Sequence, residues 1–313
     1  MGVFDQASHY ALKSDPSAFF LWRMRRFVDR FTFLGWLDTT TLAFPGEPDR
    51  ICDTVAEFAP RDGEGPRRLL DVESQSEPHG DILERLGEYA YRLRRGQRYG
   101  VGAEGKYQVV SVLLNLTGRA QPSELDMREA DLDGAGLHLR VVLITFAEED
   151  AAATLVGIAS GELSRGLLPW IPLMRGGGEA GIITEWIRLA LEEPSTPRRG
   201  DYAGLALVFA ELAGRRPVWR EALKGWNMQV SQQVLEWQAE ARIETDLERL
   251  RKVILRAIEL RFHVPVPADL RAAVTALGDI DELSRWFEAT QTSESLEAFR
   301  TAIGHTTASS NGN

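Results

Sequence analysis

The sequence predicts an α/β protein with a mixed sheet flanked by helices, followed by a mostly α-helical C-terminal part. Hydrophobic residues make up 44% and charged residues 26% of the 313 positions, a composition that builds an ordinary globular core. Between residues 14 and 146, short β-compatible runs alternate with segments of helical periodicity, which is typical of an α/β layout. Beyond residue 175 the pattern is helical only.

The first predicted elements are a helix and a hairpin. Helical spacing begins after Ser14-Asp15-Pro16 and continues to Arg30, with phenylalanines beside arginines. This pattern fits an amphipathic, locally basic helix; the alternative is a core helix with a solvated arginine face. Two β-compatible runs, residues 51–58 and 68–75, flank a loop that contains two prolines and an Asp-Gly pair. We therefore expect them to pair as a hairpin.

The next elements complete the predicted sheet. Apolar residues recur at helical spacing from residue 80 to 95, so this helix should pack one face on the sheet. The runs 107–116 and 137–146 are apolar almost throughout, as expected of central strands that are covered on both sides. The breaker Gly176-Gly177-Gly178 then marks the end of the first domain.

The domain organisation follows from this pattern. We expect an α/β domain over residues 1–175, a helical connecting region over 176–228, a helical C-terminal domain over 229–302 and a disordered tail over 303–313. A long helical run ends at His263-Val264-Pro265-Val266-Pro267, where two prolines interrupt the helix. The tail is small and polar in composition.

Charge and cysteine content restrict the classes of partner. Forty-six acidic and 36 basic residues give a net charge of −10, so a nucleic-acid contact would need a local basic face. The single cysteine, Cys52, cannot form an internal disulfide, which fits a reducing, cytoplasmic setting. We find neither a signal peptide nor an apolar run of about 18 residues, and we expect no membrane partner.

Acidic residues gather on one face of the predicted hairpin. Strand alternation places Asp71, Glu73 and Gln75 on one face of the second strand, and Asp53 on one face of the first. If Asp53 lies beside Glu73, the two carboxylates repel one another unless a cation or a proton is shared. Mg²⁺ prefers such oxygen ligands. The other interpretation of the pattern is a solvated acidic face.

The same acidic segment carries a resemblance to a known family. Asp53, the run Leu69-Leu70-Asp71-Val72-Glu73-Ser74-Gln75, and Arg85-x-x-x-Tyr89 on the following helix follow one another in order. Phe4-Asp5 and the Leu-Pro-rich segment 166–173 flank this series. The series resembles the PD-(D/E)XK nuclease superfamily, and within it the recombination-promoting nuclease and transposase branch, which typically has Glu-x-Gln. The stretch 254–300 is similar to a helical tail that is often joined to such nucleases.

The resemblance implies a restriction-endonuclease-like fold and a set of site residues. Asp53 and Glu73 would hold Mg²⁺, for which Mn²⁺ can substitute, and the backbone carbonyl of Ser74 would complete the protein ligands. Gln75 stands where the superfamily usually has lysine and would orient a water by hydrogen bonds. Asp5 matches the acid of the first helix that completes the metal shell.

Two positions depart from the family pattern. Asp71 stands where relatives more often have an uncharged residue, and Ser74 replaces a bulky apolar residue. The extra carboxylate would either bind a second cation or face water.

The helix after the hairpin offers the local positive charge that DNA binding would need. Arg85, Tyr89 and Arg92 recur at i, i+4 and i+7 on a line separate from the apolar one. This line would contact the phosphate backbone, with Arg85 as the first contact. The competing interpretation is salt pairing within the helix, for example between Glu88 and Arg92.

Together these observations predict a Mg²⁺-dependent DNA endonuclease that hydrolyses phosphodiester bonds with a metal-activated water, linked to recombination or mobile elements. The alternative is a catalytically silent protein of nuclease fold that acts in DNA binding or assembly. In that case the C-terminal helices would mediate homo-oligomer formation.

Overall fold

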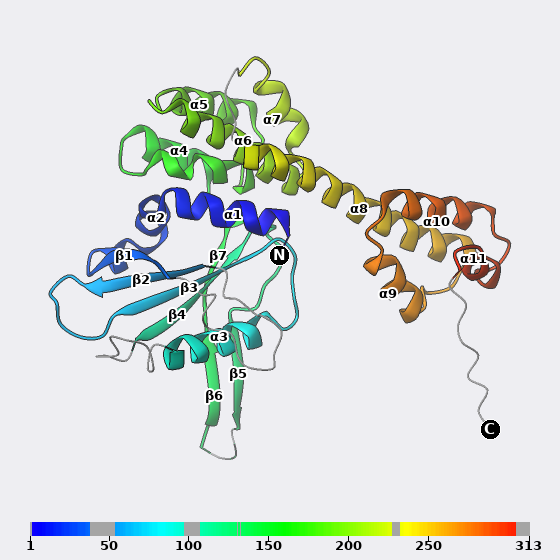
Figure 1. The fold of residues 1–313 in the computed structure, drawn as a ribbon, viewed down its shortest axis with the longest axis horizontal. Helices are drawn as coiled ribbons and strands as arrows, with labels where there is room; N and C mark the ends of the chain where they lie inside the picture. Colours follow the sequence, from blue (N-terminus) through cyan, green and yellow to red (C-terminus); the bar gives the residue numbers. More distant parts are fainter. Residues whose placement is uncertain are drawn as a thin grey trace. The chain divides into compact units, whose positions relative to one another are not determined.

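The computed structural model of the chain describes residues 2–37, 54–96, 107–129, 131, 133–226 and 232–304. Its contacts divide the chain into two compact units, residues 1–238 and 239–313 (Figure 1). The first unit contains a five-stranded mixed sheet flanked by helices, and the second is helical. The predicted α/β class, the mixed sheet and the helical C-terminal region are therefore confirmed.

The sheet has the strand order β1-β2-β3-β4-β7. These strands are Phe31–Leu37, Thr54–Pro60, Arg68–Gln75, Gln108–Asn115 and Val142–Thr145. The pairs β1–β2 and β2–β3 are antiparallel, whereas β3–β4 and β4–β7 are parallel. The expected hairpin of β2 and β3 is present. Strand β1 was not predicted, because its aromatic residues directly continue the preceding helical pattern.

Two helices cover one face of the sheet. α1 (Val3–Ser14) and α2 (Pro16–Val28) lie on the side opposite α3 (Figure 1). Asp15 caps α2 by accepting a hydrogen bond from Ala18 N, and Pro16 occupies the first turn, where a missing N–H costs nothing. Phe20 and Phe27 of α2 both meet Phe58 of β2 edge to face. Aromatic packing thus fixes α2 on the sheet.

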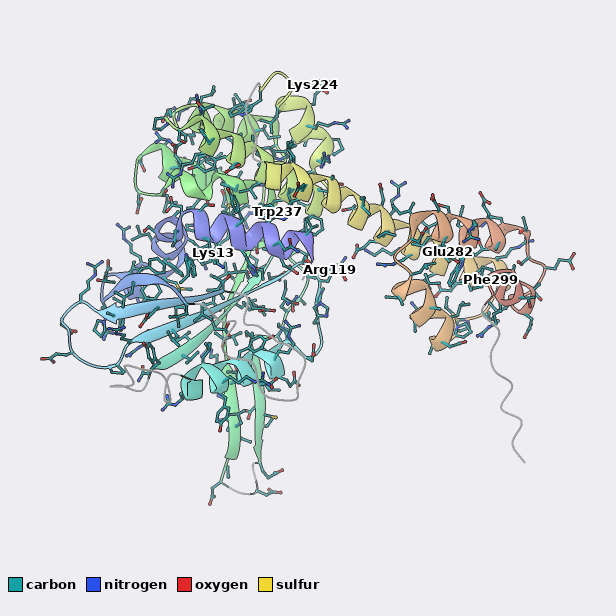
Figure 2. All side chains as sticks on the ribbon, viewed as in Figure 1. Lys13, Arg119, Lys224, Trp237, Glu282 and Phe299 are labelled. Atoms are coloured by element: carbon teal, nitrogen blue, oxygen red, sulfur yellow. The ribbon has the colours of Figure 1, made fainter. Side chains whose placement is uncertain are left out.

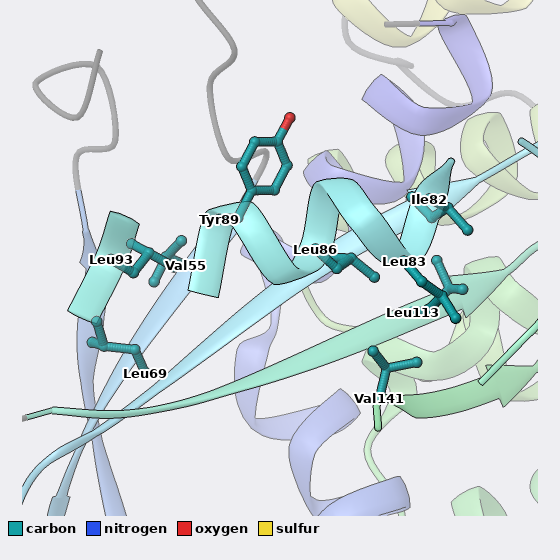
Figure 3. Close-up of a cluster of buried hydrophobic side chains, with 9 residues drawn as sticks. All are labelled: Val55, Leu69, Ile82, Leu83, Leu86, Tyr89, Leu93, Leu113 and Val141. Atoms are coloured by element: carbon teal, nitrogen blue, oxygen red, sulfur yellow. The ribbon is translucent and has the colours of Figure 1, made fainter. Parts of the chain in front are cut away.

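Helix α3 (Ile82–Gly96) covers the other face with its apolar side (Figure 3). Leu86 is fully buried and belongs to a cluster with Val55 of β2, Leu69 of β3 and Leu113 of β4. The predicted packing of this helix on the sheet is confirmed. The cluster matters for function because it fixes the face of β3 that looks toward α3.

The expected strand over residues 137–146 is two strands in two different sheets. β6 (Ala135–Arg140) pairs with β5 (Glu124–Glu129) in a separate two-stranded sheet, and β7 joins the main sheet. Most side chains of β5 and β6 are exposed, so β6 is not a covered central strand. The turn between β5 and β6 contains Asp133 and Gly134, both with positive φ, which closes the hairpin in a conformation that glycine adopts easily.

Further helices of the first unit pack beyond α1 and α2. They are η3 (Phe146–Glu148), α4 (Ala151–Ala159), η4 (Arg165–Leu173), α5 (Ala180–Leu191), α6 (Thr196–Leu212) and α7 (Arg216–Ala222). Trp170 of η4 is at their centre, stacked on Phe146 and on Phe209 of α6. The region 176–228, expected as a connecting segment, therefore packs within the first unit.

The second unit is a small helical domain with its own core. It comprises the part of α8 (Gln232–Phe262) from Ala239 onward, α9 (Ala268–Ala276), α10 (Ile280–Thr292) and α11 (Leu296–Ala302). Phe299 is fully buried among these helices (Figure 2), together with Ile254, Leu270 and Leu283. α8 ends where the proline-rich break was predicted, and His263 adopts a positive φ there.

None of the helices in the described part of the chain is both long and apolar enough to cross a membrane.

We expect Leu86→Ala to lower the free energy of unfolding by about 2–5 kcal/mol, because it removes a fully buried side chain and leaves a cavity between α3 and the sheet. Urea unfolding followed by circular dichroism measures the loss. Tyr91→Ala is the matched control, since Tyr91 lies on the same helix with 62% of its surface exposed. An equal loss in both variants would contradict this packing.

Candidate functional site

The candidate site is a strip of polar side chains on the face of β3 that looks toward α3. Strand alternation places Asp71, Glu73 and Gln75 on the same face as Leu69, which packs against α3. Their exposed fractions are 0%, 2% and 4%, so all three are withdrawn from water. Burying charged carboxylates costs several kcal/mol each unless partners compensate. The expected acidic face is therefore not a solvated one.

Arg85 of α3 compensates one of these acids. Its Nη2 forms an ion pair with Oε1 of Glu73, which also receives a hydrogen bond from Gln75 Nε2 at 3.5 Å. Burial alone would lower the pKa of Arg85, but the Glu73 carboxylate, and after it Tyr89, outweigh burial and raise that pKa above its ordinary value. The guanidinium is thus held charged against the strand.

The neighbouring strand β4 adds two polar residues that sequence reasoning missed. Ser111 of β4 pairs with Asp71, and Asn115 pairs with Gln75. Over the described residues, neither Ser111 Oγ nor Gln75 Oε1 has a hydrogen-bond partner, although both atoms are buried. A serine inside the apolar run of β4 is the sequence signal that would have identified Ser111.

The opposite face of β3 holds two other predicted residues. The hydroxyl of Ser74 is hydrogen-bonded to that of Ser8 on α1, with an O–O distance of 2.5 Å. The side chain of Ser74 therefore lies on the α1 face, away from Glu73. Asp5, also on α1, accepts a hydrogen bond from Ser76 N at 3.2 Å. The structure thus brings Asp5 to Ser76, the residue that directly follows Gln75 at the carboxyl end of β3.

The predicted metal ligands are Asp53, Glu73 and the backbone carbonyl of Ser74. Asp53 lies outside the described residues; it directly precedes Thr54, whose Cα pairs with Val72. Within the described ranges, no group of three or more His, Cys, Asp or Glu side chains could hold a metal ion. Asp71, Glu73 and the unpaired oxygen of Gln75 nevertheless form an oxygen-rich donor set. In donor type this set fits Mg²⁺, which takes oxygen ligands.

The arginines of α3 are largely engaged within the protein. Arg92 is 7% exposed and forms an ion pair with Glu88, the within-helix pairing that we considered for this line. Tyr89 is 4% exposed and belongs to the α3 core cluster. Arg94 is exposed and donates a hydrogen bond only to the carbonyl of Tyr107, with no ion pair among the described residues. Among the described side chains of this helix, Arg94 is therefore an exposed arginine that a phosphate could reach.

No protein-family model matches the chain, and no curated protein or solved structure is significantly similar to it. The candidate site is therefore interpreted from its own geometry.

We expect Arg85→Gln to destabilise the first unit by roughly 3 kcal/mol, because it leaves the Glu73 carboxylate buried without its cation. Adding Glu73→Gln should restore part of this loss, since two neutral amides need no charge compensation. The unfolding free energies of the wild type, the two single variants and the double variant form a double-mutant cycle, which measures the coupling energy between Arg85 and Glu73. Additive losses would show that the ion pair has no coupling energy.

Proposed function

We propose that the protein is a Mg²⁺-dependent hydrolase of DNA phosphodiester bonds, an endonuclease of restriction-endonuclease-like fold. The observation that carries the proposal is the buried polar strip Asp71, Glu73 and Gln75 on β3, beside the Arg85 guanidinium. Globular proteins rarely bury several acids on one strand for stability alone, because hydrophobic residues of similar size serve that purpose better. Titratable groups that are buried at a cost mark functional sites.

Each residue has a stated role in this proposal. Glu73, with Asp53 by sequence, would hold the metal ion, and Asp71 would add negative charge nearby. The bound ion would lower the pKa of a water and stabilise charge that develops on the phosphate. Gln75 Oε1, which no described residue hydrogen-bonds, can accept a hydrogen bond from the attacking water. Arg94 supplies an exposed cation for the phosphate backbone.

Recombination or mobile-element activity is part of the proposal only through the family resemblance. Glu73-Ser74-Gln75 matches the Glu-x-Gln of the recombination-promoting nuclease and transposase branch. Self-association through the C-terminal helices belongs to the same proposal. The second unit has an independent core, and Val253 and Leu260 of α8 remain exposed seven residues apart on one face.

A second candidate function is a catalytically silent protein of the same fold that binds DNA or assembles. The ion pair between Arg85 and Glu73 favours it, because the guanidinium occupies an oxygen that a metal ion would need. In this alternative Arg85 replaces the cation permanently, and the buried acids are a remnant of a site.

Plasmid nicking separates the two functions. We expect the purified full chain to nick supercoiled DNA with Mg²⁺ or Mn²⁺, and to lose at least about a hundredfold in rate on Glu73→Gln and Asp53→Asn. Glu57→Gln is the matched control, because Glu57 is an acid of the same hairpin that pairs with Arg67 and Tyr107 instead.

Chelation with EDTA should abolish nicking and leave the circular dichroism spectrum unchanged. An inactive wild type that binds DNA equally well with and without metal would contradict the endonuclease proposal and favour the silent protein.

A further inference from the structure

Two adjoining cavities lie away from β3, among helices of the first unit. The smaller, about 230 Å³, is lined by α1, η4 and α6, and the larger, about 350 Å³, by the end of α4, the start of η4 and α6. Asp15, Arg198 and Tyr202 line both. The smaller cavity is below the roughly 300–1,000 Å³ of pockets for drug-sized molecules, so its ligand should be about the size of one amino acid.

Arg198 provides an available cation at the wall that the two cavities share. Its Nη2 donates a hydrogen bond to the carbonyl of Ser14 at 3.3 Å, and across the described ranges no carboxylate forms an ion pair with it. Two parallel N–H groups of a guanidinium match a carboxylate in geometry. The neighbouring Arg165, in contrast, is already paired with Glu192.

The smaller cavity also contains acids. Asp201 Oδ2 accepts a hydrogen bond from the Tyr10 hydroxyl at 2.8 Å, and Asp15 Oδ2 accepts one from Ser164 Oγ at 2.8 Å. Two carboxylates and one guanidinium therefore line the same small space. The two acids would repel a simple anion from Arg198, whereas a zwitterion places its carboxylate on Arg198 and its ammonium group on an acid.

The remaining lining is apolar or neutral. Ala11, Pro169 and Leu205 provide aliphatic surface, and Tyr10 and Tyr202 contribute rings. Burial, and after it the Glu193 carboxylate, raise the pKa of Tyr202, so its hydroxyl stays neutral. A hydrophobic side chain of modest size would bury its surface against this wall.

From this combination we infer that the cavity between α1, η4 and α6 binds a zwitterionic α-amino acid with an apolar side chain. Arg198 binds its carboxylate, Asp201 binds its ammonium group, and the wall of Leu205 and Pro169 receives its side chain. The site uses no residue of β3, so it stands independently of the proposed nuclease.

Isothermal titration of the full chain with matched ligands tests the inference. We expect L-phenylalanine or L-leucine to bind at one site per chain, with a Kd of about 1 mM or tighter. Phenethylamine lacks the carboxylate and 3-phenylpropionate lacks the ammonium group, and each should bind at least about tenfold more weakly than phenylalanine.

Variants assign the contacts. Arg198→Gln and Asp201→Asn should each weaken binding at least about tenfold, and the asparagine keeps an oxygen that accepts from Tyr10. Arg199→Gln is the matched control, because Arg199 follows on the same helix but lines a different cavity beside Trp226.

Three results would overturn the inference: no binding of either amino acid at about 10 mM, equal binding of the singly charged analogues, or unchanged affinity in both Arg198→Gln and Asp201→Asn. Thermal melting checks that each variant is folded. If Arg198→Gln melts early, Asp201→Asn decides the outcome.

Discussion

The ion pair between Glu73 and Arg85 is the interaction on which the candidate site depends. Glu73 is on the central strand of the sheet, and its side chain is 3% exposed. A carboxylate in that position is stable only if a cation is close, and α3 supplies one from the helix that also closes the hydrophobic cluster. The position of α3 therefore determines both the packing of the hydrophobic cluster and the compensation of the Glu73 charge. A shift of α3 would expose Leu86 and separate Arg85 from Glu73 at the same time.

This dependence also explains why the same geometry supports two functions. A guanidinium and a divalent cation both neutralise Glu73, but only the second can activate a water. Asp71 is a second acid on the same face of β3, and it is fully buried. Arg85 supplies one positive charge and places it on Glu73. A divalent cation would bring two positive charges to the same face, so it would neutralise more of the acidic strip than the arginine does.

Much of the fold was predictable, and the failures have physical reasons. The β2–β3 hairpin and α3 followed from strong local signals, a two-proline loop with Asp-Gly and a clear apolar stripe. β6 and β7 were merged because a run of apolar residues says nothing about which sheet a strand joins. On the site, alternation placed Glu73 and Gln75 together, and local spacing left the Glu88–Arg92 pair open as an alternative to phosphate contact; the structure contains that pair. The pairing of Arg85 with Glu73 and of Ser8 with Ser74 depends on how distant elements meet, which no local pattern encodes.

Helix α1 connects the candidate site with the amino-acid cavity, yet the two should act independently. Ser8 contacts β3 and Tyr10 already lines the cavity, so two residues of helix separate them by roughly 3 Å along the helix axis. That distance is well within the Debye length of about 8–10 Å, so a net charge in the cavity would be felt at β3. A zwitterion adds no net charge and removes even this effect. Mechanical coupling would require a second arrangement of α1. The Ser8–Ser74 and Tyr10–Asp201 hydrogen bonds hold the middle of the helix, and Trp237 (labelled in Figure 2) packs edge to face on Tyr10. A ligand that binds in the cavity without moving α1 would not change the affinity of the β3 strip for a metal ion. Because coupling is reciprocal, a metal ion at the strip would not change the affinity of the cavity for that ligand.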